Sequence, residues 1–401
     1  MTASATTAPA RAPTNRDENW KYANLRALSR ISFEATAADR RTDPIAVALP
    51  ARTTACRLVL IDGKYSAINS DALPNGAELR IDTGSATAES ASVDHYYLNL
   101  NRRGRRETLR LRVLEGQRVQ LEILHVATHV GQPAIEVQID SSAELTLIER
   151  YISLDTATAV TNLALDLRLA EHAKLYLARW QHYASPASHI ETLNLVLGAS
   201  SECDLTQVTS AEHSETAVSS RSTVFVTHAG EGARLHWHSA TIADGQQQHD
   251  AYVRIDHQAR RVQTQQVFRG IASGRSKIGF NGHMLVGSSA HGAHSGQSLK
   301  TLLAGTEAEA NVRPQLEIYT NEVTATHGAT VGKLDADMLF YLLSRGLDPG
   351  TAESLLKWAF VSDVLTRLPT VELRHQIEAR LVLQLPGAIA ARQSSAQETA
   401  G

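Results

Sequence analysis

Cysteine is nearly absent from this 401-residue sequence, which contains only Cys56 and Cys203. Two thiols are too few for a disulfide framework or a four-thiolate metal site, and they are typical of a reducing compartment. The sequence also lacks any apolar run near the roughly 18 residues that a membrane-spanning helix needs. Residues 1–19 are rich in Ala, Thr and Pro and lack the apolar core of a secretory signal. We therefore expect a disordered tail there and a cytoplasmic protein.

An excess of charge of one sign is missing too, since the formal net charge is −3. This balance gives no reason to expect a nucleic-acid or membrane-surface partner. The sequence has no Walker-type phosphate loop, no Gly-x-Ser-x-Gly elbow and no His-Glu-x-x-His motif. The glycine-rich segment 270–274 lies between strand-like stretches and is better explained as a turn. We therefore expect a protein without catalytic activity.

The most informative feature is an internal repeat of about thirty residues. One set of leucines recurs every thirty residues, each in a segment that alternates apolar and polar residues: Leu145, Leu175, Leu205 and Leu235. A second set recurs at intervals of 28, 31 and 29 residues: Leu167, Leu195, Val226 and Ile255. Alternation indicates strands with one buried face, and a fixed period indicates stacked coils that cover each other.

These repeats predict a mainly β protein with a right-handed parallel β-helix, or solenoid, as its core. A β-sandwich is the alternative, although its strand spacing need not repeat. The repeat weakens after residue 260, where glycines interrupt it: Gly270, Gly274, Gly279, Gly282 and Gly287. Strand-like stretches persist as far as Tyr319.

The two ends of the chain have other patterns. At the front, residues 20–28 predict a short helix, and residues 57–65 predict a hairpin with an Asp62-Gly63 turn. After residue 334 the apolar period becomes 3.6, with Asp335 or Asp337 as a helix N-cap, Gly346 as a stop and Asp348-Pro349 as a second helix start.

The second C-terminal helix should bury one face, formed by Leu355, Leu356, Ala359, Phe360, Val364 and Leu365, and a third helix should bury Leu373, Ile377, Leu381 and Leu385. These helices could cover an open solenoid end or serve as a docking module. We predict five regions: tail 1–19, mixed α/β lead-in region 20–115, β-helix core 116–333, C-terminal helical domain 334–390 and tail 391–401.

Histidine is abundant, with seventeen residues, and two pairs have spacing compatible with a metal site. His236 and His238 share one face of a strand, and His291 and His294 lie in a loop. Neither pair has an identifiable third ligand. An exposed strand face and a polar loop are therefore the preferred interpretations.

The segment from about residue 263 to 364 resembles the SufD branch of the SufB/SufD family. The matching residues lie at 265–270, 277–282, 313–319, 326–335, 339–347 and 359–360, and weaker similarity extends upstream to residues 20–22. The resemblance implies a parallel β-helix with helical ends. It also implies a non-catalytic scaffold subunit of the SufBCD complex for iron–sulfur cluster assembly, with SufB as the runner-up within the family.

The resemblance to the SufB/SufD family also predicts binding partners. The resemblance implies pairing with SufB through the β-helix and with the SufC ATPase through the C-terminal helices. A homodimer of the isolated chain stays open as an alternative. The resemblance also implies a transient iron–sulfur cluster on the assembled complex, with none bound tightly by the isolated chain.

His327 matches the family histidine at the SufB interface and is our candidate ligand for the cluster and its metal. Many relatives carry Cys two residues earlier, where this chain has Ala325. We therefore expect the cluster to depend on His327 and on cysteines of the partner. Cys203 lies at the start of a predicted strand, and we expect it to act as a small buried apolar residue.

Two other functions stay open as hypotheses. Parallel β-helices include polysaccharide lyases and hydrolases, but these need clustered acidic residues, and the acidic residues here are scattered. A stand-alone metal-binding protein would use His236 and His238.

Overall fold

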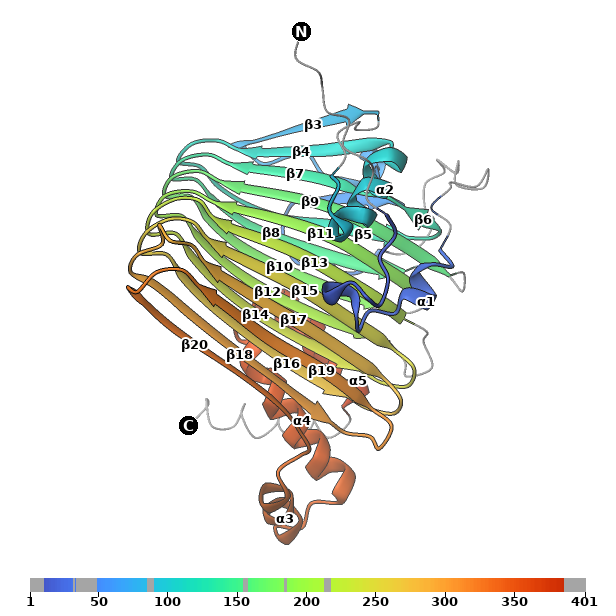
Figure 1. Ribbon diagram of the computed structural model, residues 1–401. Helices are drawn as coiled ribbons and strands as arrows, with labels where there is room; N and C mark the ends of the chain where they lie inside the picture. The colour runs from blue at the N-terminus through green and yellow to red at the C-terminus, as the bar shows by residue number, and fades with distance from the viewer. Residues whose placement is uncertain are drawn as a thin grey trace, which may run out of the picture.

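The structure is a computed structural model that describes residues 11–31, 33, 49–84, 90–153, 158–183, 186–212 and 218–385. The predicted tail 391–401 and the first ten residues of the predicted tail 1–19 lie outside this part. Most described elements are strands. Successive strands alternate between two facing sheets, so the chain forms a flattened solenoid (Figure 1). The predicted parallel β-helix with C-terminal helices is confirmed.

Sheet A and sheet B each receive one strand from every coil. Sheet A contains, in spatial order, β2 (Lys64–Tyr65), β1 (Arg57–Ile61), β5 (Arg118–Ala127), β8 (Glu144–Ser153), β10 (Lys174–Tyr183), β12 (Glu202–Ala211), β14 (Arg234–Ala243), β16 (Gln263–Ala272), β18 (Ala293–Leu303) and β20 (Val323–Gly332). Sheet B contains β19 (Glu309–Ile318), β17 (Lys277–Val286), β15 (Gln248–His257), β13 (Val218–His228), β11 (Ala187–Leu197), β9 (Ala159–Leu169), β7 (Ala134–Ile139), β4 (Glu107–Val113) and β3 (Ala77–Thr83), and β6 (Val130–Gly131) pairs with β9. Pairing is parallel except in β1–β2 and β3–β4.

The register of the strands confirms one of the two predicted repeats. Leu195 lies opposite both Leu167 and Val226, as expected. The other repeat was partly wrong, because Leu175 lies opposite Cys203, two residues before Leu205. A shift of two residues keeps the same side chains on the inner face of a strand, so the apolar pattern alone cannot detect it.

The coils also continue beyond residue 260, where the repeat had been expected to fade. Gly270 and Gly282 are strand residues of β16 and β17, on the face that points into the lumen, the space between the two sheets. A Cβ on Gly282 would collide with Gln297, and one on Gly270 would crowd Thr301. These glycines therefore make room for larger luminal side chains instead of interrupting the solenoid.

On one side of the solenoid, a row of backbone hydrogen bonds joins the turns of successive coils, and we call this row the turn ladder. In each turn, a residue with positive φ donates its N–H to a carbonyl of the following coil, at 2.8–3.0 Å in the pairs Ser142 to Glu171, His172 to Ala199, Ser200 to Glu231, Gly232 to Arg260 and Arg261 to His291. Glycine adopts this backbone conformation without strain, whereas other L-residues do so at a cost.

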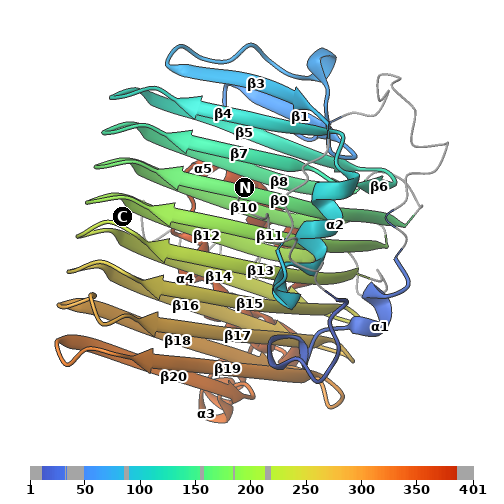
Figure 2. The ribbon, with the colours of Figure 1, turned by 45° about the horizontal axis from the view of Figure 1, so that its top comes forward.

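The N-terminal part of the chain covers the outer face of sheet B (Figure 2). It comprises η1 (Glu18–Trp20), α1 (Leu25–Leu28), η4 (Val93–His95) and α2 (Tyr96–Gly104), whereas η3 (Ala67–Asn69) follows the β1–β2 hairpin and contacts β1 of sheet A. Trp20, Leu28 and Tyr97 pack there against Ile190 of β11. The helix predicted over residues 20–28 is shorter than expected. The Asp62-Gly63 hairpin is confirmed, with φ of 46° and 81° at its two turn residues.

Strands before residue 116 belong to the same two sheets. β1 pairs in parallel with β5, and β4 pairs in parallel with β7. The stacked strands therefore begin within the region 20–115 that the sequence pattern separated from the core.

The C-terminal helices begin where the sequence predicted. They are α3 (Ala336–Ser344), α4 (Pro349–Leu365) and α5 (Val371–Gln384). The Asp335 carboxylate accepts the backbone N–H of Asp337 and of Met338, and Asp348 accepts that of Thr351. These bonds satisfy N–H groups that the first turn of a helix leaves unpaired.

Helices α4 and α5 lie against the side of the solenoid and not across its end. Their apolar residues Val361, Val364, Leu373 and Ile377 pack with outward-facing residues of sheet A such as Trp180. The expected buried face of α4 was partly wrong, because Ala359 is exposed while Ala352 and Val361 are buried. The end of the solenoid at β19 and β20 is therefore left uncovered by these two helices.

Candidate functional site at the open end of the solenoid

The two sheets end together at β19 and β20. Each of these strands has a strand neighbour on only one side in the described structure, and the two lie at the same end of the solenoid (Figure 1). Neither strand contains a buried residue. An edge of this kind presents a row of backbone N–H and C=O groups to which another strand can pair. We call this surface, formed by β19 and β20, the open edge.

His327 lies on the open edge. In the strand register it is opposite Gln297 of β18, and Gln297 is opposite Gln266 of β16. The Gln297 amide donates to Gln266 Oε1 at 2.6 Å. Since Gln266 and Gln297 are buried between the sheets, His327 continues a column of luminal polar side chains and is itself exposed at the mouth of the lumen.

This chain provides few other ligands beside His327. Ala325, two residues earlier, lies opposite Ser295, and both lack a thiol. Within the described residues, no three His, Cys, Asp or Glu side chains are grouped so as to hold a metal ion. Among the described residues, His327 is therefore not part of a three-ligand metal site.

Both cysteines lie away from solvent in the luminal core. Cys203 is 1% exposed and Cys56 is 7% exposed. Burial raises the pKa of both thiols, because the apolar core disfavours the thiolate. Both therefore act as small apolar core residues, as predicted for Cys203.

His236 and His238, the predicted histidine pair, lie on the same strand, β14, but differ in burial. The exposed His236 pairs through Nδ1 with the Asp204 carboxylate at 2.8 Å, and this hydrogen bond raises the pKa of His236. His238 is 7% exposed, and burial lowers its pKa. The two imidazoles thus have different environments.

A second exposed surface follows the open edge directly in the chain. Helix α3 has no buried residue, and four of its large apolar side chains are exposed, with Met338 at 57%, Phe340 at 72%, Tyr341 at 55% and Leu343 at 37%. We call these four residues the α3 surface. Helix α3 projects beyond the end of the sheets (Figure 1). Exposed apolar groups of this size are typical of protein-contact sites.

Sequence reasoning missed a group of charged residues inside the lumen. We call Glu149, Arg179 and Glu191 the luminal ion cluster; all three side chains are 0% exposed. Arg179 Nε donates to Glu149 at 2.8 Å, and its two terminal nitrogens donate to Glu191 at 3.1 and 2.8 Å. The Arg179 charge keeps the pKa of both carboxyls below their usual range despite burial.

A signal for this cluster was present in the sequence. Leu145, Leu147 and Glu149 alternate along one strand, so the charged residue falls on the inner face with the leucines. The period-two pattern therefore identified the direction of each side chain, although it gave no partner for the charge.

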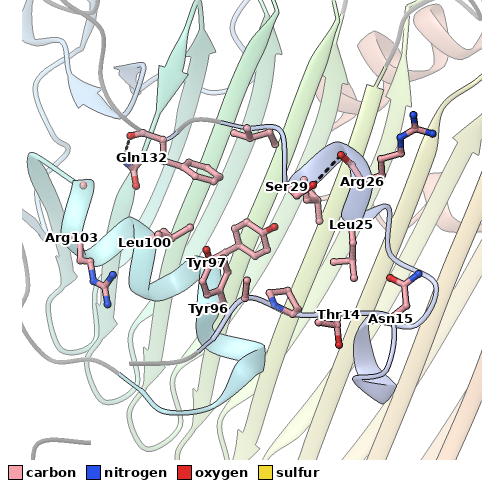
Figure 3. Close-up of a pocket in the computed structure, with 16 residues that line it drawn as sticks. Thr14, Asn15, Leu25, Arg26, Ser29, Tyr96, Tyr97, Leu100, Arg103 and Gln132 are labelled. Atoms are coloured by element: carbon pink, nitrogen blue, oxygen red, sulfur yellow. Dashed lines mark hydrogen bonds between the residues drawn. The ribbon is translucent and has the colours of Figure 1, made fainter. Parts of the chain in front are cut away.

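Another hollow lies between α1, α2 and residues 12–15. It has a volume of about 1160 Å³ and a mainly apolar lining that includes Tyr96 and Leu100. The side chains of Arg26 and Arg103 point away from its centre (Figure 3). These two guanidinium groups therefore do not converge on the hollow as the polar groups of a ligand site do.

Comparison with protein families now assigns the chain. Residues 122–360 match the model described as "SUF system FeS cluster assembly, SufBD core domain". The chain belongs to this family. The matched SufBD core runs from β5 through most of α4, so it includes the open edge, the α3 surface and the luminal ion cluster.

Relatives in the SufBD family align over nearly the whole chain. The chain is 28% identical to the iron–sulfur cluster assembly protein SufD of Escherichia coli, over 94% of this chain and 90% of the relative. It is 26% identical to the SufBD family protein slr0076 of Synechocystis, over 92% and 86%, and 23% identical to the chloroplastic protein ABCI7 of Arabidopsis thaliana, over 91% and 81%. The chain is therefore a SufD homologue.

None of the described helices is both long enough and apolar enough to span a membrane.

Proposed function

We propose that this protein is a non-catalytic scaffold subunit of a cytoplasmic SufBCD complex that assembles iron–sulfur clusters. The observation that carries the proposal is the coincidence of two unpaired strand edges and an exposed His327 at one end of the solenoid. A SufB-like role within the same family is the alternative. The low cysteine content favours the SufD role, because a subunit that carries the cluster alone would need more thiolate ligands.

The open edge is the proposed surface for SufB. A partner with the same coil geometry can continue both sheets, because parallel strands pair through evenly spaced backbone hydrogen bonds. The apolar residues Ile318, Tyr319 and Val331 at or beside this edge are exposed and would be covered by such a partner. A second copy of this chain could occupy the same edge when SufB is absent.

A substitution at the edge tests this surface. Val331→Asp should weaken co-purification with SufB strongly, because it places a charge where the partner strands would stack. Leu383→Asp on α5 is the matched control, since Leu383 is 69% exposed and lies on another surface. Equal capture of SufB by both variants would reject the open edge as the contact.

His327 is the proposed ligand that this subunit contributes to the nascent cluster. Neutral imidazole binds iron and holds it less firmly than thiolate does, which suits cargo that must be passed on. Since Ala325 supplies no thiolate, the remaining ligands would come from cysteines of SufB. The isolated chain would therefore hold no cluster tightly.

The ligand assignment is tested on the assembled complex. His327→Ala should lower its iron and sulfide content while the subunit composition stays unchanged. His294→Ala is the matched control, because His294 is also exposed and lies on the neighbouring strand β18. Unchanged iron and sulfide in the His327 variant would remove this residue from the site.

The α3 surface is the proposed contact for the SufC ATPase, and ATP hydrolysis would belong to that partner. Phe340→Asp should reduce SufC capture, with Ile68→Asp as the control, because Ile68 is 77% exposed and lies outside the C-terminal helices. Single surface substitutions are better than deletion of residues 335–386, because that deletion would expose the apolar face of sheet A that α4 and α5 cover. Full SufC capture by the Phe340 variant would contradict this assignment.

A further inference from the structure

A small cavity lined by both polar and apolar side chains lies in the lumen, separate from the open edge and the α3 surface. Its volume is about 30 Å³, and its lining includes Thr209, Ser222, Trp237, Ser239 and His249. Solenoid interiors are normally filled by apolar side chains, as most of this one is. The combination of open space and polar groups at this point therefore requires an explanation.

Two buried nitrogen atoms on residues that line this cavity have no hydrogen-bond partner in the described part of the chain. They are Nε1 of Trp237 and Nε2 of His249, whose residues are 3% and 5% exposed. The other ring nitrogen of His249 is within 2.7 Å of Ser220 Oγ. An unpaired buried N–H costs about 1–3 kcal/mol, so such groups are normally satisfied by protein or by bound solvent.

The cavity also borders the luminal ion cluster. The Ser222 hydroxyl donates to Glu191 Oε1 at 2.5 Å. Since its proton is directed at Glu191, Ser222 has only lone pairs left for another neighbour. The indole N–H of Trp237, in contrast, can only donate. A molecule that bridges the two must both donate and accept hydrogen bonds.

We propose that the cavity is a binding site for about two water molecules, which link Ser222 to Trp237 and His249. A water molecule needs roughly 10–15 Å³ of such space and two to four polar partners, and the cavity meets both requirements. An anion is disfavoured because the neighbouring ion cluster contains two carboxylates and one guanidinium. A cation is disfavoured by the indole N–H of Trp237.

These waters would connect two polar stretches of the lumen. Trp237 lies opposite Gln266, which is bonded to Gln297, and Gln297 lies opposite His327. On the other side, Gln181 donates to Glu191 and accepts from Thr209, each at 3.3 Å. Polar side chains would then extend from the luminal ion cluster toward the open edge, with Trp237–Gln266 and Gln297–His327 related as neighbours in the strand register. The site itself does not depend on the proposed function.

Nitrogen-15 NMR of the full chain tests the site, because the sequence has only four tryptophans and hence four indole N–H signals. We expect cross-relaxation between water and the Trp237 N–H, assigned by its loss in Trp237→Phe. Trp20 is the matched control: it is 1% exposed, and its indole N–H donates to Asp94 at 2.8 Å. Its signal should show no water contact.

A crystal structure then separates bound water from a signal relayed by neighbouring hydroxyl protons. Density within about 3 Å of Trp237 Nε1, not attributable to protein atoms, supports the proposal. Either an indole signal of Trp237 without water contact or a cavity without such density overturns it. Equal water contact at Trp20 and Trp237 would also overturn it, since that result would reflect general solvent exchange.

Discussion

Arg179 and Glu191 join the two sheets across the interior of the solenoid. Arg179 belongs to β10 of sheet A and Glu191 to β11 of sheet B, and two parallel N–H···O bonds of 3.1 and 2.8 Å connect them. Paired bonds of this type fix orientation as well as distance. The luminal ion cluster therefore holds successive strands of one coil at a defined separation.

Breaking this pair should destabilise the fold strongly. Glu191→Ala leaves the Arg179 charge incompletely paired where it is fully buried, and we expect a loss of about 3–5 kcal/mol in the free energy of unfolding. Denaturant titration measures the effect. Glu115→Ala, at an exposed position, is the control and should change stability by less than about 0.5 kcal/mol. A loss below about 1 kcal/mol at Glu191 would show that the cluster is not structurally important.

Stability should fall in mild acid because of buried neutral histidines. Burial lowers the pKa of His249 to about 4, whereas an unfolded histidine titrates near 6.5. The unfolded chain therefore binds more protons between about pH 4 and 6.5, and stability decreases as the pH drops through that range. His257 has a similar environment, with its pKa lowered to about 4.

Removal of one of these imidazoles should weaken the dependence of stability on pH. In His249→Asn, about 2 kcal/mol of the stability difference between pH 7 and pH 5 should disappear, whatever the baseline stability of the variant. His294→Asn, at an exposed position, should retain the wild-type slope. Chemical unfolding at the two pH values provides the measurement, and parallel profiles for wild type and the His249 variant would refute the explanation.

Substitutions at two positions of the turn ladder should change stability in opposite directions. Ser142 is exposed and has a φ of 57°, so Ser142→Gly should relieve backbone strain and stabilise the protein by up to about 1 kcal/mol. Gly232 has a φ of 71° and has space for a Cβ, so Gly232→Ala should destabilise by about 1 kcal/mol through the backbone alone. Thermal unfolding of the pair checks both, and a shift of the same sign in both would contradict the account.

The luminal glycines predict a packing effect. Gly282→Ala would place a methyl group against the Gln297 amide, and we expect a loss of about 1–3 kcal/mol. Gly328→Ala is the control, because Gly328 has no atom within 4 Å of an added Cβ. If Gly282→Ala is as stable as Gly328→Ala, the Gln297 side chain must have room to move away from the added methyl group, which would contradict this account.

Patterns in the sequence were enough to predict the main strands, the C-terminal helices and the stacking of coils. Alternation of Leu145, Leu147 and their counterparts fixed which face of each strand is buried, and the period near thirty predicted stacked coils. The helix starts at Asp335 and Asp348 and the turn at Asp62-Gly63 followed from short-range hydrogen bonding and backbone preference. The alternation, the helix starts and the turn depend on residues close together in the chain, and the repeat depends on a fixed spacing; a sequence displays both directly.

Tertiary structure decided the features that depend on turn length and docking. The turn lengths place Cys203, and not Leu205, opposite Leu175, and the packing of α4 and α5 buries Trp180 while the open edge stays exposed. The sequence likewise held Glu149, Arg179 and Glu191 at inward positions without revealing that they meet. Alternation determines the direction of a side chain, but only the stacking of coils determines its neighbours.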